Sequence, residues 1–325
     1  MTLNVLKNAP ELVDGQILVW TAALDDTAEM RFEQLARLLS RDENQRAFRF
    51  RFERDRKRFI VCRGVLREIL GTYLGKDPDK IDFNYGPQGK PYLKGPEGQT
   101  AGSVYFNVSH SSGWAICAVG LGEVGVDLEI MRPIPEMEAL VDQYFSVAER
   151  SAFGSIPPDL RVKAFFNCWT RKEAYVKACG GGLLIPLDQF DVSVDPESPA
   201  RLVRVQGIPG DQLPWSLHSF DLSTEAVAAL VCPRDNEPRL CGSCPIEESQ
   251  RRKRLNSIRA IDSPVAGSRA RGSAASQRSA ASGSAPDCAR PDSAAAWQNQ
   301  KACIVGDQRQ TTPLERGVPP QPSFS

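Results

Sequence analysis

The run Gly125-Val126-Asp127-Leu128-Glu129-Ile130 has the alternating pattern of a β-strand with one apolar face and one acidic face. Because successive side chains of a strand point to opposite sides, the apolar residues face one way while Asp127 and Glu129 face the other. Residues i and i+2 stand about 7 Å apart along a strand, so both carboxylates could reach one hard cation. A strand with a solvated face has the same pattern, and this run alone leaves both interpretations open.

A third carboxylate follows on a predicted helix. Apolar residues recur at helical spacing along residues 162–176, and Glu173 falls in register with Trp169. A buried acid must be protonated, paired with a cation or bound to a metal, because burying it alone costs several kcal/mol. The simpler alternative is an i, i+4 ion pair with Lys177 on an exposed face, worth about 0.3–0.5 kcal/mol.

The charge of the chain is balanced overall but divided between an acidic body and a basic tail. Residues 1–250 hold 28 Lys and Arg against 35 Asp and Glu, whereas residues 251–325 hold 12 against 5. After Pro233 the periodicity stops, and we expect the Ser-, Ala- and Arg-rich tail to be disordered. The basic cluster 251–254 is weak evidence for nucleic-acid binding, and the acidic body argues against it for the protein as a whole.

The cysteines and the lack of a long apolar run favour a reducing, membrane-free setting. A reduced thiol packs as a small hydrophobic group. Four of the nine cysteines lie within apolar patterns: Cys62, Cys117, Cys168 and Cys179. Cys241 and Cys244 form a single Cys-x-x-Cys without a second pair, so a structural zinc site is not expected. With neither a signal-peptide layout nor about 18 consecutive apolar residues, we expect a cytoplasmic protein.

The periodicity predicts an α+β chain in which one order of elements occurs twice. Helices are expected over residues 27–39, 55–74 and 136–144, and in the Glu173 run that closes at Gly180. Strands are expected over residues 17–24, 81–85, 104–109, 114–119, 124–130, 190–194, 202–205, 215–220 and 227–232. The three strands between residues 104 and 130 read as an antiparallel meander. A helix followed by strands in residues 55–130 recurs in residues 161–232, which indicates duplication of one unit.

Three basic features could meet a phosphate. Seven cationic side chains crowd residues 46–58, and Arg63 and Arg67 continue along one helix face. Lys90 stands in the turn Gly89-Lys90-Pro91, and His110 ends a strand among serines, which suits a phosphate or a ribose. A solvated charged face, a turn lysine and a structural histidine are the simpler alternatives.

Three blocks together resemble the 4′-phosphopantetheinyl transferases of the surfactin-synthetase-activating type. The blocks are Gly89-Lys90-Pro91 with Phe106-Asn107-Val108-Ser109-His110-Ser111, then residues 125–129, then residues 169–177 (WTRKEAYVK). Their order and spacing agree with the family over roughly residues 15–232. The resemblance implies a monomeric pseudo-dimer of two similar halves, each a helix packed on a small antiparallel sheet. The halves would be residues 1–123 and 124–232, the second carrying the metal site, followed by the tail 233–325.

The resemblance also implies a holo-[acyl-carrier-protein] synthase type of reaction. Such an enzyme transfers phosphopantetheine from coenzyme A to a serine of an apo acyl or peptidyl carrier protein, releasing 3′,5′-ADP. By this match Asp127, Glu129 and Glu173 would hold Mg²⁺, which agrees with an all-oxygen donor set. Glu173 would also be the general base, and Lys177 would contact the pyrophosphate, with Lys172 nearby. The nucleotide end would be bound by four further residues: Arg58, Lys90, Ser109 and His110.

Two departures from the family pattern are visible. Asp42 and Glu43 stand where some relatives have basic residues, and the tail after Pro233 has no counterpart. Two other functions stay open. A Mg²⁺-dependent nucleotide pyrophosphohydrolase would use water in place of serine, and a non-catalytic nucleotide- or carrier-binding module would not need Glu173.

Overall fold

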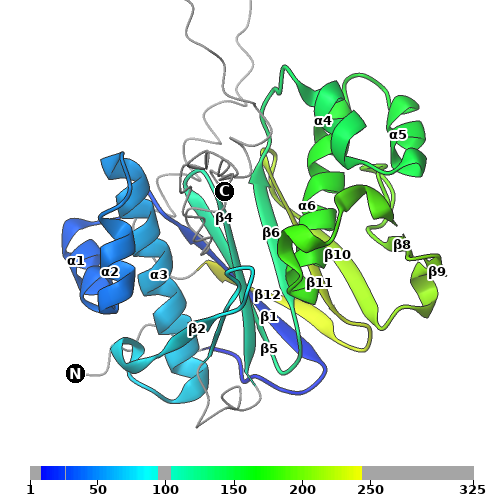
Figure 1. Ribbon diagram of the computed structural model, residues 1–325. Helices are drawn as coiled ribbons and strands as arrows, with labels where there is room; N and C mark the ends of the chain where they lie inside the picture. Colours follow the sequence, from blue (N-terminus) through cyan, green and yellow to red (C-terminus); the bar gives the residue numbers. More distant parts are fainter. Residues whose placement is uncertain (1–8, 26, 94–103, 244–325) are drawn as a thin grey trace, which may run out of the picture.

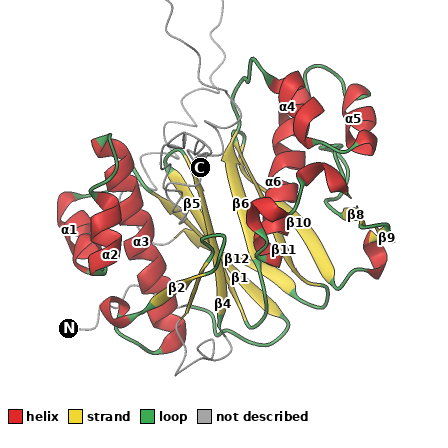
Figure 2. Ribbon diagram, in the orientation of Figure 1, coloured by secondary structure: helices red, strands yellow, loops and turns green. Residues whose placement is uncertain are grey.

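The computed structural model describes residues 9–25, 27–93 and 104–243 of the 325-residue chain. Its helices and strands are shown in Figure 1 and Figure 2. In chain order the α-helices are α1 (Glu29–Arg37), α2 (Arg41–Ala47), α3 (Glu53–Leu74), α4 (Met137–Tyr144), α5 (Val147–Gly154) and α6 (Arg161–Cys179). Short 3-10 turns occur at Pro78–Lys80, Gly182–Leu184, Leu187–Gln189 and Gly210–Gln212.

The strands form two main sheets and two small ones. In the first half they are β1 (Gln16–Ala23), β2 (Phe83–Tyr85), β3 (Pro91–Leu93), β4 (Tyr105–Ser111) and β5 (Trp114–Gly120). They continue with β6 (Gly125–Ile130), β7 (Phe190–Val192), β8 (Leu202–Val205), β9 (Ile208–Pro209), β10 (Trp215–Ser223), β11 (Ala226–Pro233) and β12 (Glu237–Ser243). The main sheets have the orders β12-β1-β5-β4 and β10-β11-β6, while β2-β3 and β7-β8-β9 are the small ones.

One order of elements occurs twice along the chain. In residues 16–120, β1 precedes three helices, the hairpin β2–β3 and the hairpin β4–β5. In residues 125–233, β6 precedes three helices, the pair β7–β8 and the hairpin β10–β11. In both halves the second strand of the long hairpin pairs antiparallel with the first strand of that half. The fold is therefore α+β, as predicted, and the repeated order begins with a strand, whereas the sequence comparison began it at a helix.

The predicted meander is only partly correct. The strands β4 and β5 form the expected antiparallel hairpin. The third strand, β6, pairs instead with β11, which lies about 100 residues further along the chain. The alternation of apolar residues identifies a strand but does not encode its partner, and β6 therefore opens the second sheet and does not extend the first.

The strand β12 corrects the expected start of the tail. Residues Glu237–Ser243 form a parallel strand against β1, with Gln16 opposite Glu237 and Val19 opposite Leu240. The segment was expected to be disordered because it lacks apolar alternation. Its backbone nevertheless completes the edge of the first sheet, so the folded part of the chain extends at least to Ser243. The remainder of the predicted tail lies outside the described residues.

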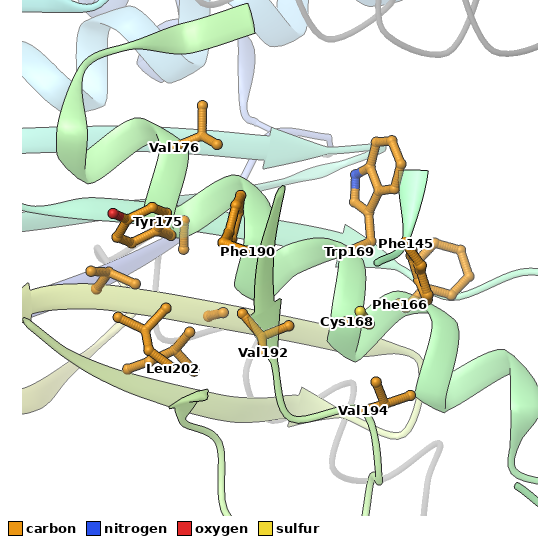
Figure 3. Packing of buried hydrophobic residues seen from close by; sticks show 14 of the residues in the cluster. Phe145, Phe166, Cys168, Trp169, Tyr175, Val176, Phe190, Val192, Val194 and Leu202 are labelled. Carbon is orange, nitrogen blue, oxygen red and sulfur yellow. The ribbon is translucent and has the colours of Figure 1, made fainter. Parts of the chain in front are cut away.

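Three apolar layers support this arrangement. The helices α1–α3 cover the outer side of one sheet and α4–α6 cover the outer side of the other, as Figure 1 shows. Figure 3 shows the second of these layers, which contains Phe166 and Trp169 of α6 together with Phe190 of β7. A third layer lies between the two sheets and contains Val19 from β1 with Val126 from β6. The halves thus share a core and are not independently packed.

The two long helices end and are anchored in the same way. Both α3 and α6 end at a glycine in the left-handed region, Gly75 with φ 60° and Gly180 with φ 67°. This conformation costs an L-residue energy that glycine does not incur. The helix α6 was expected to close at Gly180, and it does.

A buried glutamate holds each long helix to the short helix before it. Glu43, the capping-box residue of α2, accepts hydrogen bonds from Arg63 (2.6 Å) and Arg67 (2.7 Å) of α3. Glu149, the capping-box residue of α5, forms an ion pair of 2.7 Å with Lys172 of α6. All five side chains are buried. Removing one partner of such a pair typically costs about 3–5 kcal/mol, because the remaining charge is left in the interior.

Two further expectations concern cysteines and membranes. Cys62, Cys117 and Cys168 are buried and reduced, as expected, whereas Cys179 is exposed at the end of α6. The apolar pattern placed Cys179 on the core side, but in the last turn of α6 it is Val176 and Ala178 that face the core. Among the described helices, none is long and apolar enough to cross a lipid bilayer.

Candidate active site between the two halves

The acidic residues of β6 are buried where the two halves meet. Asp127 is 0% exposed and Glu129 is 3% exposed, and both lie on the opposite face of β6 from Val126 and Leu128. The predicted alternation is therefore present, but the acidic face is not solvated. Two buried carboxylates need compensating cations or hydrogen bonds, since water is not there to supply them.

The helix α6 lies directly against β6. A Cβ atom added at Gly125 would stand 2.1 Å from the carbonyl oxygen of Ala174 and 2.2 Å from the amide nitrogen of Ala178. Only glycine permits this approach. It brings the face of α6 that carries Glu173 and, one turn later, Lys177 next to the acidic face of the strand.

Lys177 is the cation that meets the buried acids. Its ammonium group lies 2.8 Å from Asp127 Oδ1, 3.0 Å from Ser109 Oγ and 3.3 Å from the carbonyl oxygen of Val126. The simple i, i+4 alternative, in which Lys177 serves an exposed pair with Glu173, does not describe this contact. Lys177 pairs across to the strand, and Glu173 is half-buried on the same side of α6.

Side chains of β4 complete the site from the other half. The Ser109 hydroxyl donates to Asp127 Oδ1 at 2.8 Å, and the Ser111 hydroxyl donates to Glu129 Oε2 at 2.7 Å. Asn107 Oδ1 accepts from the Val126 amide at 2.9 Å. These three side chains alternate along β4 and face β6. Ser109, predicted to bind coenzyme A, thus contacts a predicted metal ligand.

The three predicted metal ligands are not gathered into a closed cluster. Within residues 9–25, 27–93 and 104–243, no three His, Cys, Asp or Glu side chains are grouped so as to hold a metal ion. The donor chemistry nevertheless fits a hard cation, since two buried carboxylates on β6 and the half-buried Glu173 on the neighbouring helix are all oxygen donors. A Mg²⁺ ion bound to Asp127 would compete with the Lys177 ammonium for this carboxylate.

Two predicted coenzyme A ligands, Arg58 and His110, lie near the C-terminal end of β4. Arg58 at the start of α3 donates to both carboxylate oxygens of Asp25, at 2.7 and 2.6 Å. Asp25 in turn lies against Gly113 in the turn between β4 and β5. The hydrogen bond from Arg58 lowers the pKa of Asp25, and the same hydrogen bond raises the pKa of Arg58. His110 is buried on the α3-facing side of β4, away from Asp127.

Lys90 lies at the opposite end of β6. Its ammonium group contacts Glu123 Oε2 at 2.8 Å, the Val124 carbonyl at 3.4 Å and the Ala178 carbonyl at 3.3 Å. Because β6 rises about 3.3 Å per residue, the two ends of this strand are roughly 17 Å apart. Lys90 is therefore not brought together with Arg58 and His110, and only an extended ligand could contact both groups.

Lys172 is not part of the site. It is 0% exposed, and besides Glu149 it donates to the carbonyl oxygens of Leu187 (2.6 Å) and Phe190 (2.7 Å). Consecutive residues of a helix are about 100° apart around its axis, so Lys172 and Glu173 face different neighbours. The structure gives Lys172 an anchoring role in the second core.

The arginine-rich segment divides into a buried part and an exposed part. Arg63 and Arg67, which were expected as possible phosphate ligands, are buried and form ion pairs with Glu43. Glu43, one of the two departures from the family pattern, is therefore their counter-ion. Arg49 and Arg51 are exposed beside Phe48 (76% exposed) and Phe52 (58% exposed) at the corner between α2 and α3. This corner is basic and partly apolar.

Asn107 and Ser111 are functional candidates that the sequence reasoning missed. The signal was present, because Asn107, Ser109 and Ser111 are polar at i, i+2 and i+4 of one strand, while Phe106 before them and Val108 between the first two are apolar. A polar face on a strand was considered only for β6. Applying the same reasoning to β4 would have identified the second side of the site.

Two family models match this chain. Residues 26–121 match the model described as 4′-phosphopantetheinyl transferase, N-terminal, and residues 123–232 match the 4′-phosphopantetheinyl transferase superfamily. The boundary between the two matches falls between β5 and β6, where the order of elements starts again.

Individual relatives agree with these models. The 4′-phosphopantetheinyl transferase HetI of Nostoc sp. is 39% identical over 221 residues, which cover 68% of this chain and 89% of the relative. A putative 4′-phosphopantetheinyl transferase of Synechocystis sp. is 37% identical over 188 residues, 57% of this chain and 73% of the relative. The 4′-phosphopantetheinyl transferase Sfp of Bacillus subtilis is 30% identical over 160 residues, 49% of this chain and 68% of the relative.

Proposed function

Because the chain belongs to the 4′-phosphopantetheinyl transferase superfamily, we propose that it transfers 4′-phosphopantetheine from coenzyme A to a serine of an apo carrier protein. The products are the holo carrier protein and 3′,5′-ADP, and the subtype is the surfactin-synthetase-activating one. The observation that carries this proposal is the pair of buried carboxylates on β6, reached by Lys177 from α6 and by serines from β4.

Asp127, Glu129 and Glu173 would hold Mg²⁺. When bound, the ion would neutralise charge on the coenzyme A pyrophosphate, which favours departure of the 3′,5′-ADP group. An acid pair that is 0% and 3% exposed suits this task, because electrostatic interactions are stronger away from water.

Glu173 accepts the proton of the incoming serine. The serine oxygen attacks the phosphorus atom that bears pantetheine, and the bond from that phosphorus to the oxygen of the ADP phosphate breaks. The serine proton passes to the Glu173 carboxylate, directly or through water. Lys177, which already reaches the edge of β6, contacts the pyrophosphate and balances the charge that develops on the leaving group.

His110 and Arg58 bind the nucleotide end of coenzyme A. Both lie toward the α3 side of the site, where a 3′-phosphate would meet a guanidinium and an imidazole. His110→Ala should raise KM for coenzyme A about tenfold and change kcat much less, because it removes ground-state binding. A variant in which kcat falls alone would assign His110 to the chemistry instead.

The basic corner between α2 and α3 receives the carrier protein. Residues 46–58 hold seven Lys and Arg against two acids, on a body that is otherwise acidic, and Phe48 and Phe52 are exposed among them. Arginine and aromatic side chains dominate binding at protein interfaces, and a basic surface steers an acidic partner.

Charge reversal at this corner tests the docking role. The double change Arg49→Glu and Arg51→Glu should raise KM for an acidic carrier, more strongly at low salt, while KM for coenzyme A stays the same. Arg201→Glu, an exposed arginine in the second half, is the matched control. Equal effects on KM for the carrier in both variants would contradict a docking role for this corner.

The reaction itself is tested by mass spectrometry. Purified protein, coenzyme A, MgCl₂ and one apo carrier at a time should yield a carrier heavier by one phosphopantetheine group, together with 3′,5′-ADP. Cleavage of coenzyme A while the carrier mass stays unchanged would favour the pyrophosphohydrolase. Binding of carrier with neither product would favour the non-catalytic module.

A further inference from the structure

The strands β4 and β6 are each the last strand of their own sheet. The strand β6 pairs with β11 along one edge, and its other edge faces β4. Contacts between β4 and β6 run through side chains, from Asn107 to Val126 at one end and from Ser111 to Ile130 at the other. The residue numbers rise together, so the two strands run parallel.

Each serine on this seam receives one hydrogen bond and gives another. Lys177 donates to Ser109 Oγ at 3.0 Å, and Ser109 donates to Asp127 Oδ1 at 2.8 Å. The backbone amide of Ile130 donates to Ser111 Oγ at 3.1 Å, and Ser111 donates to Glu129 Oε2 at 2.7 Å.

The direction of both hydroxyl groups is fixed by their neighbours. An ammonium group and an amide can only donate, while an ionised carboxylate can only accept. Each serine proton must therefore point at an acidic oxygen of β6. Because the serine side chains are themselves buried, with Ser109 1% and Ser111 8% exposed, water does not compete for these bonds.

The register of β6 against β4 is held at two points. Asn107 binds the Val126 amide, and Ser111 binds the Ile130 amide four residues later. A slip of one residue would exchange the acidic face of β6 for its apolar face. The two contacts thus select the register that turns Asp127 and Glu129 toward α6.

We propose that Ser109 and Ser111 are positioning residues that aim the two β6 carboxylates for metal binding. The first half of the chain thereby sets the metal-binding geometry of the second. This inference rests on the proposed function, because it concerns the same acids, and it identifies why the site lies between the halves. Ligand-orienting hydrogen bonds of this kind typically change metal affinity by about 10–100-fold when they are lost.

Ser111 gives the cleaner test, because Ser109 also contacts Lys177. Ser111→Ala removes the hydroxyl, and Ser111→Thr retains it on a side chain that strands accommodate well. The matched control is Ser223→Ala. Ser223 is also the last residue before the hairpin turn, in β10 of the second half, and it is exposed.

The first measurement is Mn²⁺ binding to the full-length protein, followed by electron paramagnetic resonance of free Mn²⁺. Ser111→Ala should weaken binding by about 10–100-fold, whereas Ser111→Thr and Ser223→Ala should bind like the wild type. Unchanged affinity in Ser111→Ala would overturn the inference, and so would loss of affinity in the Thr variant equal to that in Ala.

The second measurement needs no metal. Hydrogen exchange at the Ile130 amide should be faster in Ser111→Ala than in the wild type, and unchanged in Ser223→Ala. Equal protection of Ile130 in all variants would show that Ser111 does not hold the strand, which also overturns the inference.

The outcomes separate the two proposals. A wild-type protein that binds Mn²⁺ through a Ser111-dependent site but modifies no carrier would contradict only the proposed function. A protein that modifies its carrier, and whose Mn²⁺ affinity is unaffected by Ser111→Ala, would contradict only the positioning role.

Discussion

The strands β1 and β6 occupy the same place in the two halves but carry opposite chemistry. Each pairs with the second strand of its long hairpin, and Ala23 corresponds to Ile130 because each pairs with the first residue of that strand. Three residues earlier stand Trp20 in β1 and Asp127 in β6. Trp20 packs under α3 in an apolar core, whereas Asp127 binds Lys177 and Ser109.

The outer edges of these strands are closed in different ways. The edge of β1 is covered by β12 through a parallel backbone ladder. The edge of β6 is covered by side chains of β4, which bind the acids as well as the backbone. A backbone ladder stabilises a strand but leaves its side chains to the core. When side chains cover a strand edge, the regular backbone ladder is lost at that edge. In exchange, the side chains supply hydrogen bonds to the charged groups of the site.

The long helices show the same contrast. Seven residues before the closing glycines Gly75 and Gly180 stand Glu68 in α3 and Glu173 in α6. Glu68 is buried and is paired with Arg31 of α1. The helices and strands are therefore arranged alike in both halves. In the second half, however, the acid of the long helix lies beside two acids on the first strand.

The largest expected difference is the one between the glutamine variants of these two glutamates. Glu173→Gln should lower kcat by about 10³-fold or more, since it removes the proposed base and one proposed metal ligand. Asp127→Ala should act similarly. Glu68→Gln should leave kcat of the folded enzyme nearly unchanged and lower its melting temperature. Steady-state kinetics with circular dichroism decide the comparison, and full turnover in Glu173→Gln would remove this glutamate from the mechanism.

The next effect separates two lysines of α6. Lys172→Met should lower the free energy of unfolding by about 3–5 kcal/mol, because it leaves Glu149 buried without its cation. The KM for coenzyme A should stay within about twofold of wild type in protein that remains folded. Lys177→Met should instead raise KM or lower kcat. Urea unfolding and kinetics measure both, and a large KM change in Lys172→Met would return this residue to the site.

Removing β12 should have a smaller effect, confined to the first half. A chain ending at Ser243 should unfold at the same temperature as the full protein. A chain ending at Asn236 should lose roughly 1 kcal/mol for each ladder hydrogen bond to β1. Calorimetry of the two truncated proteins gives the difference. Equal stability would mean that β12 adds nothing to the edge of β1.

The smallest expected effect is on the pH dependence of stability, to which the two capping-box glutamates Glu43 and Glu149 contribute with opposite sign. Burial by itself raises the pKa of Glu43, but Arg63 and Arg67 outweigh it and hold this pKa below its usual value. For Glu149, burial outweighs Lys172, and the pKa is raised. Glu43 therefore contributes stability that is lost as pH falls through its folded-state pKa. The contribution of Glu149 is present at low pH and declines as pH rises past the usual glutamate range.

Glutamine variants measure this difference. The destabilisation by Glu43→Gln should shrink as the pH falls through the glutamate range, and that by Glu149→Gln should grow. Urea unfolding at a series of pH values gives both slopes. Parallel slopes would contradict the opposite shifts.

Local chemistry in the sequence predicted most elements and the acidic pair. The helix that ends at Gly180 and the alternation of β6 each depend on residues within one element, and both occur. Periodicity could not predict which strand pairs with β6, because any apolar strand of suitable length satisfies the same pattern. The strand β12 carries no such pattern, and its place is decided by the open edge of β1.

The roles of individual charges were harder to predict than the positions of the elements. The family resemblance implied that Lys172 lies near the substrate, although the helix turns it toward Glu149. The same resemblance implied that Ser109 and His110 bind the nucleotide together, although alternation along β4 turns these two side chains to opposite faces. In both cases the geometry of a single element already contained the answer.

The pairing of β12 with β1 also has a consequence for biosynthesis. Gln16 meets Glu237, so the first sheet gains its last strand only after about 220 further residues have left the ribosome. Such distant closure is slow, because the entropy of a long loop must be overcome before the contact stabilises anything. Until then the outer edge of β1 is an open template for other strands, and a chaperone that shields this edge would raise the yield of native protein.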